Sequence, residues 1–242
     1  MKLYLLWAFL FASTQAAPIW VSKDSLSKMK TIPKYPKFQD DIVNAVTGFA
    51  KKITTGSEND LDTPQYRRVQ IFNENQDDEF EEREYEGDKY WACYKRVISP
   101  AQGDNGMFMK LFRYIQGNNA DEVKIEMTKP VSTKWTPMNE AMKTIEKEMC
   151  FYLNEEFQVN PPQPTDPDVY LVQRPAMTVY TRVQGGWMDD KDWKKESRVL
   201  DQLLDENGLQ VESSYFYVNG YNSPWDPIGR RNEVWKVKKN LK

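Results

Sequence analysis

The chain has 242 residues, of which 40% are hydrophobic, and a formal net charge of −3. This length allows one sizeable core, and we expect a single domain. Basic and acidic residues are interspersed in a mildly acidic chain, which excludes the electrostatic footprint of a nucleic-acid-binding protein. The sequence contains no histidine. A Ser-His-Asp or Cys-His catalytic arrangement, a histidine-ligated zinc and a histidine-ligated haem iron are therefore excluded.

The first residues have the pattern of a secretory signal peptide, residues 1–16. Lys2 supplies a positive charge, Leu3 to Ala12 form an uncharged apolar run, and small residues lead to an expected cleavage after Ala16. The run is too short for a membrane span, and no later segment is apolar enough to cross a bilayer. We therefore expect a secreted, extracellular protein or one in the lumen of the secretory pathway.

Residues 17–65 are interpreted as an N-terminal extension that contains one amphipathic helix. Apolar residues share one helical face from Phe38 to Ile53, with acidic residues at the start and basic residues at the end. Those charges complement the helix dipole. We expect this helix to cap the main core; the alternative is a lipid-binding or partner-binding helix.

Strands are predicted by alternation at Tyr66 to Phe72 and at Tyr90 to Ile98. The acidic run between them, Asp77 to Glu86, is interpreted as a solvated edge strand. A calcium site is the alternative for its carboxylates, but the run lacks the spacing of a calcium loop with its turn glycine.

The stretch from Gly106 to Trp135 predicts a helix that leads into a strand. Apolar residues recur at helical spacing up to Gly117, where the pattern changes to the alternation of a half-buried strand. The helix positions are Phe108, Leu111, Phe112 and Ile115, and the strand positions are Val123, Ile125 and Met127. Pro130 ends or bends this strand because proline cannot donate to a ladder, and an extended segment follows it.

A strand at Phe151 to Leu153 ends the first half and leads into an exposed, proline-rich connector between the halves, Asn160 to Asp168. The second half repeats this order. Further strands are predicted at Val169 to Gln173, Met177 to Val183, Ser213 to Val218 and Glu233 to Lys238, with a helix at Asp189 to Asn207.

The two helices end at Gly117 and Gly208, which are 91 residues apart. This repeat predicts an α+β domain of two pseudo-symmetric β-α-β-β units, whose two antiparallel sheets meet with the helices outside. A cleft where the halves join would be the default ligand site.

Cys93 and Cys150 are the two cysteines, and both lie in predicted strands. In an oxidising compartment we expect them to be bridged. Sequence alone does not establish that their Cα atoms come close enough.

Several segments resemble the SOUL haem-binding protein family, in order from about Tyr66 to Lys238. They are EREYEGDKYWACY, FRYIQGNN, KIEMTKPV, FYLNEEFQVNPPQP, VYTRVQGG and GYNSPWDPIGRRNEVWKV. The resemblance implies a SOUL-like domain at 66–242, with a distorted β-barrel of two repeated units flanked by two helices.

The resemblance also implies binding of haem or another porphyrin-like tetrapyrrole. The ligand would occupy a shallow hydrophobic pocket between the first helix and the loop before the final strand. The pocket residues carried over from the family are Phe108, Met109, Phe112, Arg113, Trp225 and Ile228. Arg113 would meet a propionate, because guanidinium groups suit carboxylates.

Each of these residues also has a structural interpretation. Phe108 and Phe112 are at core spacing, and Trp225 could brace a turn. Glu233 could accept hydrogen bonds from Arg230 and Arg231, or instead point into the cleft and bind a cation. The residues that could in principle reach iron are Tyr90, Tyr94, Met127, Met177 and Cys150.

Three functions follow. The first is non-catalytic, reversible binding of haem or another flat hydrophobic ligand without histidine ligation and without a metal site formed by the protein. The second is an extracellular interaction protein that has lost the ligand site and uses the N-terminal helix and acidic strand as contact surfaces. The third is a hydrolase that uses carboxylates, for which the spacing gives no support.

Overall fold

The computed structural model describes residues 63–98, 106–139, 142–222 and 229–239. The strands are β1 (Tyr66–Phe72), β2 (Phe80–Tyr85), β3 (Lys89–Ile98), β4 (Val131–Pro137), β5 (Ile145–Tyr152), β6 (Val169–Arg174), β7 (Met177–Gln184), β8 (Phe216–Gly220) and β9 (Asn232–Val237). The helices are α4 (Met107–Ile115), the 3₁₀ helix η1 (Glu155–Phe157) and α5 (Asp190–Glu206). The predicted signal peptide and the predicted helix at Phe38 to Ile53 lie outside the described residues.

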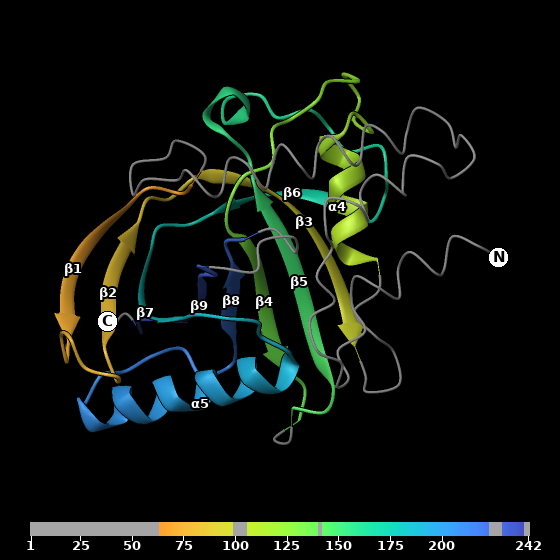
Figure 1. The fold of residues 1–242 in the computed structure, drawn as a ribbon. Coiled ribbons are helices and arrows are strands. Elements are labelled where there is room, and N and C mark those ends of the chain that lie inside the picture. The colour runs from red at the N-terminus through yellow and green to blue at the C-terminus, as the bar shows by residue number, and fades with distance from the viewer. Residues whose placement is uncertain (1–62, 99–105, 140–141, 223–228, 240–242) are drawn as a thin grey trace, which may run out of the picture.

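The described strands form one sheet in the order β1-β2-β7-β9-β8-β4-β5-β3-β6 (Figure 1). Every neighbouring pair is antiparallel. The α+β class with two flanking helices is confirmed. The expectation of two separate sheets is wrong, because β4 pairs with β8 and joins the halves through backbone hydrogen bonds. The sheet is curled but not closed, since β1 and β6 are its edges.

The pseudo-symmetry is visible in the strand order. One unit is β2-β3-α4-β4-β5 and the other is β6-β7-α5-β8-β9. The first strand of each unit lies in the other half of the sheet, because β2 pairs with β7 and β6 pairs with β3. The two halves are therefore interlocked as well as joined at the centre.

Both helices cover the same face of the sheet. Val131 packs in the cluster beneath α4, and Trp135 belongs to the cluster beneath α5. These residues are four apart in β4, so their side chains point to one face. Helix α5 begins at a capping box in which the Asp189 side chain accepts hydrogen bonds from Lys191 and Asp192.

We call the opposite face the helix-free face, because neither α4 nor α5 packs on it. It carries alternate residues of the same strands, which form two aromatic-rich clusters. Their fully packed members are Tyr85, Trp91, Cys93, Cys150, Tyr152, Val179, Tyr217 and Trp235.

Two predicted strands differ in the structure. The acidic run does contain β2, but β2 is paired on both sides rather than an edge, and its Glu81, Glu82 and Arg83 are buried. The segment with Val123 and Ile125 lies outside the described strands. Ile125 is buried in the cluster beneath α4, and its backbone N–H donates to the Ile115 carbonyl at 2.8 Å, which holds the segment against the end of α4.

Cys93 and Cys150 form a disulfide, as expected. They are directly opposed in the β3–β5 pair, with a Cα–Cα distance of 4.1 Å. Both are fully buried on the helix-free face. The bond therefore ties two strands that are already adjacent in the sheet.

The carboxylate of Glu233 is fully buried on the helix-free face and accepts hydrogen bonds from four side chains. Arg83 Nη1 donates to its two oxygens at 3.0 and 3.1 Å, and Arg231 Nε donates at 2.8 Å. Trp235 Nε1 and the Tyr221 hydroxyl complete the set at 2.7 and 2.8 Å. The network connects β2, β9 and the base of the β8–β9 hairpin.

Burial would raise the pKa of Glu233, but attraction to Arg83 and Arg231 outweighs burial and lowers it. The interpretation that Glu233 accepts hydrogen bonds from a neighbouring arginine is confirmed for Arg231. The cation-binding alternative is wrong, because a cation would have to displace two guanidinium groups. Arg230 instead lies over the Trp187 ring at 3.9 Å.

Reduction of the disulfide should lower the free energy of unfolding by about 4 kcal/mol, because the bond constrains the unfolded chain across a separation of 57 residues. The measurement is urea unfolding of the wild type with and without reductant. The double variant C93A/C150A is the control and should not respond to reductant. An unchanged wild-type midpoint under reducing conditions would contradict the prediction.

Glu233→Gln should destabilise the fold by about 3–5 kcal/mol, because it leaves Arg83 buried with less compensating charge. The matched control is Glu84→Gln. Glu84 pairs with Arg67 at side-chain exposures of 44% and 69%, so its loss should cost less than about 1 kcal/mol. Equal losses of stability in the two variants, measured by urea unfolding, would contradict the prediction that the buried network stabilises the fold more than an exposed ion pair does.

The stabilisation by Glu233 should depend on pH. Its folded-state pKa lies below the ordinary value of 4.5, so its contribution is present above that pH and is lost as the pH falls through the folded pKa. The stability difference between wild type and Glu233→Gln should therefore shrink as the pH falls below 4.5. A difference that stays constant as the pH falls would refute the assignment.

Candidate functional site

Helix α4 divides its residues between the core and the surface. Met107, Leu111 and Ile115 are buried, and the helix packs on β3, β5 and β6. Arg113 is exposed on the outer side. This division follows from apolar residues at three- and four-residue spacing, which place a stripe toward the sheet.

The structure places four of the six predicted pocket residues on α4. Phe108 and Met109 are half-buried, Phe112 is only 3% exposed, and Arg113 is exposed. The Phe108 ring stacks on Phe112 at 5.7 Å between centroids and lies 5.2 Å from the Phe151 ring. Phe112 is therefore a core residue, and Phe108 and Met109 remain on the accessible side. Trp225 and Ile228 lie outside the described residues.

The core beneath α4 reaches the surface through a set of half-buried apolar side chains. They come from the helix, the sheet and the segments between them. The set comprises Tyr90, Tyr94, Phe108, Met109, Met127, Val131, Met149, Phe157 and Leu171. This is the chemistry that a flat apolar ligand requires, since such sites are mostly apolar with a few polar groups.

Two acidic residues pair with Lys110 and occupy its ammonium group, which disfavours a ligand-binding role for it. Its Nζ donates to Asp168 and lies 3.2 Å from a carboxylate oxygen of Asp166. It also lies over the Tyr94 ring at 5.2 Å. Hydrogen bonding to Asp168 raises the pKa of Lys110, and a hydrogen bond from the Asp168 backbone N–H lowers the pKa of Asp166. The exposed Arg113 is the basic residue of α4 that points to solvent.

The proline-rich connector is more ordered than its composition suggested. The Tyr114 hydroxyl donates to the Pro162 carbonyl at 2.8 Å, and Ala120 N–H donates to the Gln163 carbonyl at 2.8 Å. The expectation of an exposed connector is wrong for Pro161 and Pro162, which are buried, whereas the other connector residues are exposed or half-buried. Burial raises the pKa of Tyr114, which stays protonated and able to donate. No pattern in the sequence indicated that Asp166 and Asp168 would contact α4.

The candidate iron ligands are separated by the fold. Tyr90, Tyr94 and Met127 lie beside α4, whereas Met177 packs on the helix-free face. Cys150 is bonded to Cys93 and cannot coordinate iron. Within the described ranges, no group of three or more Asp, Glu or Cys residues is arranged to hold a metal ion.

Among the described residues, no helix is both long and apolar enough to span a bilayer.

Known proteins share much of this sequence. The chain is 35% identical over 133 residues to human Heme-binding protein 2, an alignment that covers 55% of this chain and 65% of that protein. It is 32% identical over 164 residues to pig Heme-binding protein 1, which covers 67% of this chain and 86% of that protein. The chain thus spans just under two thirds of the human relative.

A solved structure supports the fold alone. The cryo-EM structure of an EcmrR–DNA complex matches with a TM-score of 0.51 and 11% sequence identity, covering 99% of this chain and 78% of that one. At this identity the similarity describes the arrangement of strands and helices and carries no functional argument.

A family model described as SOUL heme-binding protein matches residues 61–237. The matched region contains every described strand and helix. The chain therefore belongs to the SOUL haem-binding protein family.

Proposed function

We propose that this protein binds haem or another tetrapyrrole reversibly on the α4 side of the sheet and catalyses no reaction. Membership of the SOUL family carries the proposal. Relatives named Heme-binding protein 1 and Heme-binding protein 2 support the ligand class. The half-buried apolar set around α4 supports the position.

The residues present fit the periphery of a tetrapyrrole. Met109 and Arg113 are four apart in α4, so an apolar thioether and a guanidinium share one side of the helix. Phe108 offers a ring beside them, backed by Phe112. In this arrangement the macrocycle contacts Phe108 and Met109, while Arg113 pairs with a propionate at the rim.

The absence of histidine in the chain determines the type of binding. Haem supplies iron that can take axial ligands, but this chain offers no imidazole for it. Affinity would then come from burial of the flat macrocycle and from the propionate contact. A porphyrin without iron should bind nearly as well as haem.

We further propose that the protein is secreted or resides in the secretory lumen. The Cys93–Cys150 disulfide supports an oxidising compartment, since such bonds are rare in reducing ones. The signal-peptide pattern at residues 1–16 is the second support.

One observation favours an alternative, an extracellular interaction protein that keeps the fold without the ligand site. Phe112 fills the space between α4 and the sheet rather than lining an opening. The acidic strand cannot be its contact surface, because Glu81 and Glu82 of β2 are buried and paired with basic residues. The porphyrin titration below distinguishes the two functions.

Titration of the purified protein with haem and with free-base protoporphyrin should give saturable spectral changes. The two dissociation constants should agree within about tenfold, because no histidine adds a coordinate bond. Absorbance in the Soret region provides the measurement. Absence of a saturable change with either compound would support the interaction-protein alternative.

Arg113→Glu should weaken porphyrin binding by about tenfold or more, because it replaces an attraction to the propionate by a repulsion. Arg198→Glu on α5 is the matched control, since Arg198 is also an exposed arginine of a helix. It should bind porphyrin as the wild type does. An equal loss in both variants would indicate only the change of net charge.

A further inference from the structure

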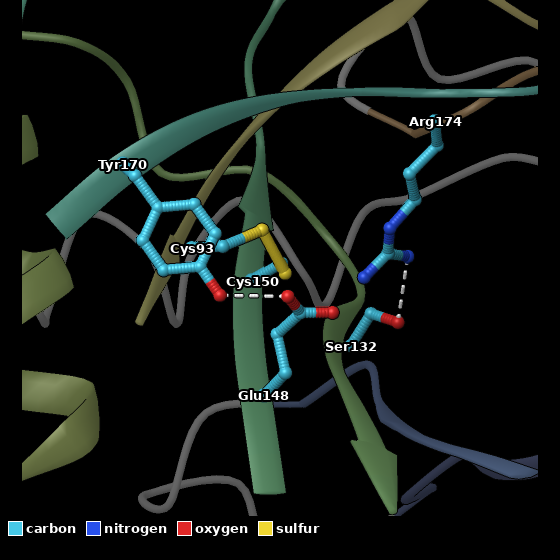
Figure 2. The surroundings of a disulfide bond; sticks show 6 residues. All are labelled: Cys93, Ser132, Glu148, Cys150, Tyr170 and Arg174. Atoms are coloured by element: carbon cyan, nitrogen blue, oxygen red, sulfur yellow. Dashed lines mark hydrogen bonds between the residues drawn. A yellow bond between two sulfur atoms is a disulfide. The ribbon is translucent and has the colours of Figure 1, made fainter. Parts of the chain in front are cut away.

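Arg174 ends β6 with its side chain on the helix-free face, where it is 6% exposed. Its guanidinium lies over the Trp91 ring at 3.9 Å and the Tyr217 ring at 5.0 Å. Nη1 donates to the Ser132 hydroxyl at 3.0 Å (Figure 2). Both rings lie at cation–π distance from the guanidinium, and neither ring supplies a carboxylate to accept its hydrogen bonds, so the N–H groups are the part that can bind a polar partner.

One edge of this guanidinium has no hydrogen-bond partner among the residues that the structure describes. Nη2 is buried without a hydrogen bond, and Nε makes none to a residue in the described parts of the chain. No carboxylate among those residues comes within 4.0 Å of the group. Nη2 and Nε together form the side-on fork that binds a carboxylate through two parallel hydrogen bonds.

The other half of the sheet contains a buried arginine that does have carboxylate partners. Arg83 lies 91 residues earlier, in β2, the strand that corresponds to β6 in the repeat. It is also buried, but it pairs with Glu81 and Glu233. A buried arginine is costly without an anion, and burial lowers the pKa of Arg174. Arg174 thus has the setting of Arg83 without its carboxylates.

Glu148 approaches the same space from β5. One of its oxygens accepts a hydrogen bond from the Tyr170 hydroxyl at 2.7 Å. The other oxygen accepts none from a side chain that the structure describes. Figure 2 shows Glu148 and Arg174 reaching toward one another from different strands, and their charges interact although they are too far apart for an ion pair. Glu148 is half-buried, so its carboxylate is partly accessible to solvent.

We propose that Arg174 and Glu148 form a binding site for a small zwitterion of the α-amino-acid type. The ligand carboxylate takes the Nε and Nη2 fork of Arg174, and the ligand ammonium group donates to the free oxygen of Glu148. A simple anion is disfavoured because Glu148 would repel it, and a simple cation is disfavoured by Arg174. The site lies across the sheet from α4 and does not depend on tetrapyrrole binding.

Calorimetric titration of the full chain with glycine and with L-phenylalanine tests the proposal. At least one should bind saturably. N-acetyl-L-phenylalanine, which lacks the ammonium group, and L-phenylalaninamide, which lacks the carboxylate, should each bind at least about tenfold more weakly than L-phenylalanine if that is the ligand. For glycine, N-acetylglycine and glycinamide replace them. Equal binding of an acid and its N-acetyl derivative would overturn the role of Glu148, and absence of binding by both amino acids would overturn the site.

Variants locate the binding. Arg174→Met and Glu148→Gln should each weaken amino-acid binding at least about tenfold, whereas Glu84→Gln on an exposed ion pair should not change it. If Arg174→Met does not fold, two other measurements test the site. They are the binding of the amino acid to Glu148→Gln and the binding of the N-acetyl and amide derivatives to the wild type. Retained binding in folded Glu148→Gln would overturn the proposal. Porphyrin titration of Glu148→Gln should match the wild type.

Discussion

The buried carboxylate of Glu233 is the interaction on which the arrangement of the sheet most depends. Arg83 on β2 and Arg231 at the hairpin base both converge on it. Strand β2 belongs to the first unit but lies in the second half of the sheet. Arg83 can be buried there because Glu233, together with Glu81, supplies the opposite charge. Removal of one partner would leave the other desolvated and unpaired, which is the costly case for buried ions.

The two faces of the sheet have different chemistry. Both helices cover one face, where the packing is apolar and the half-buried set around α4 reaches the surface. The helix-free face holds the disulfide, the Glu233 network and the buried Arg174, among aromatic rings. A flat apolar ligand suits the first face, and a small charged ligand suits the second. If both proposals hold, the alternation of side chains along shared strands places the two ligands on opposite faces of the sheet.

Local pattern predicted much of this fold. The alternation at Tyr66 to Phe72 and the helix between Asp189 and Gly208 match β1 and α5 closely. The glycines at both helix ends adopt positive φ, 108° at Gly117 and 67° at Gly208, which side chains with a Cβ disfavour. The disulfide was expected because the predicted compartment is oxidising. The β3–β5 register then places the two cysteines directly opposite each other.

The predictions that were wrong share a physical cause, because each concerned residues whose structural partners are distant in the sequence. Arg83 and Glu233 are 150 residues apart, so the charges of β2 indicated solvent rather than burial. The single sheet depends on the pairing of β4 with β8. Alternation near Ile125 predicted a strand, but no neighbouring strand lies there to pair with it among the described residues. For the site, helical spacing placed Phe112 toward the sheet without showing whether it would line a pocket or fill one.

The most direct test of the account is a map of where a porphyrin contacts the protein. Backbone amide NMR spectra of the labelled chain, recorded during titration with free-base protoporphyrin, would supply it. The account predicts saturable shifts that cluster at Phe108 to Arg113 and at the neighbouring Met127, with none at Cys93 or Cys150. Shifts centred on the helix-free face, or no saturable shifts at all, would contradict it.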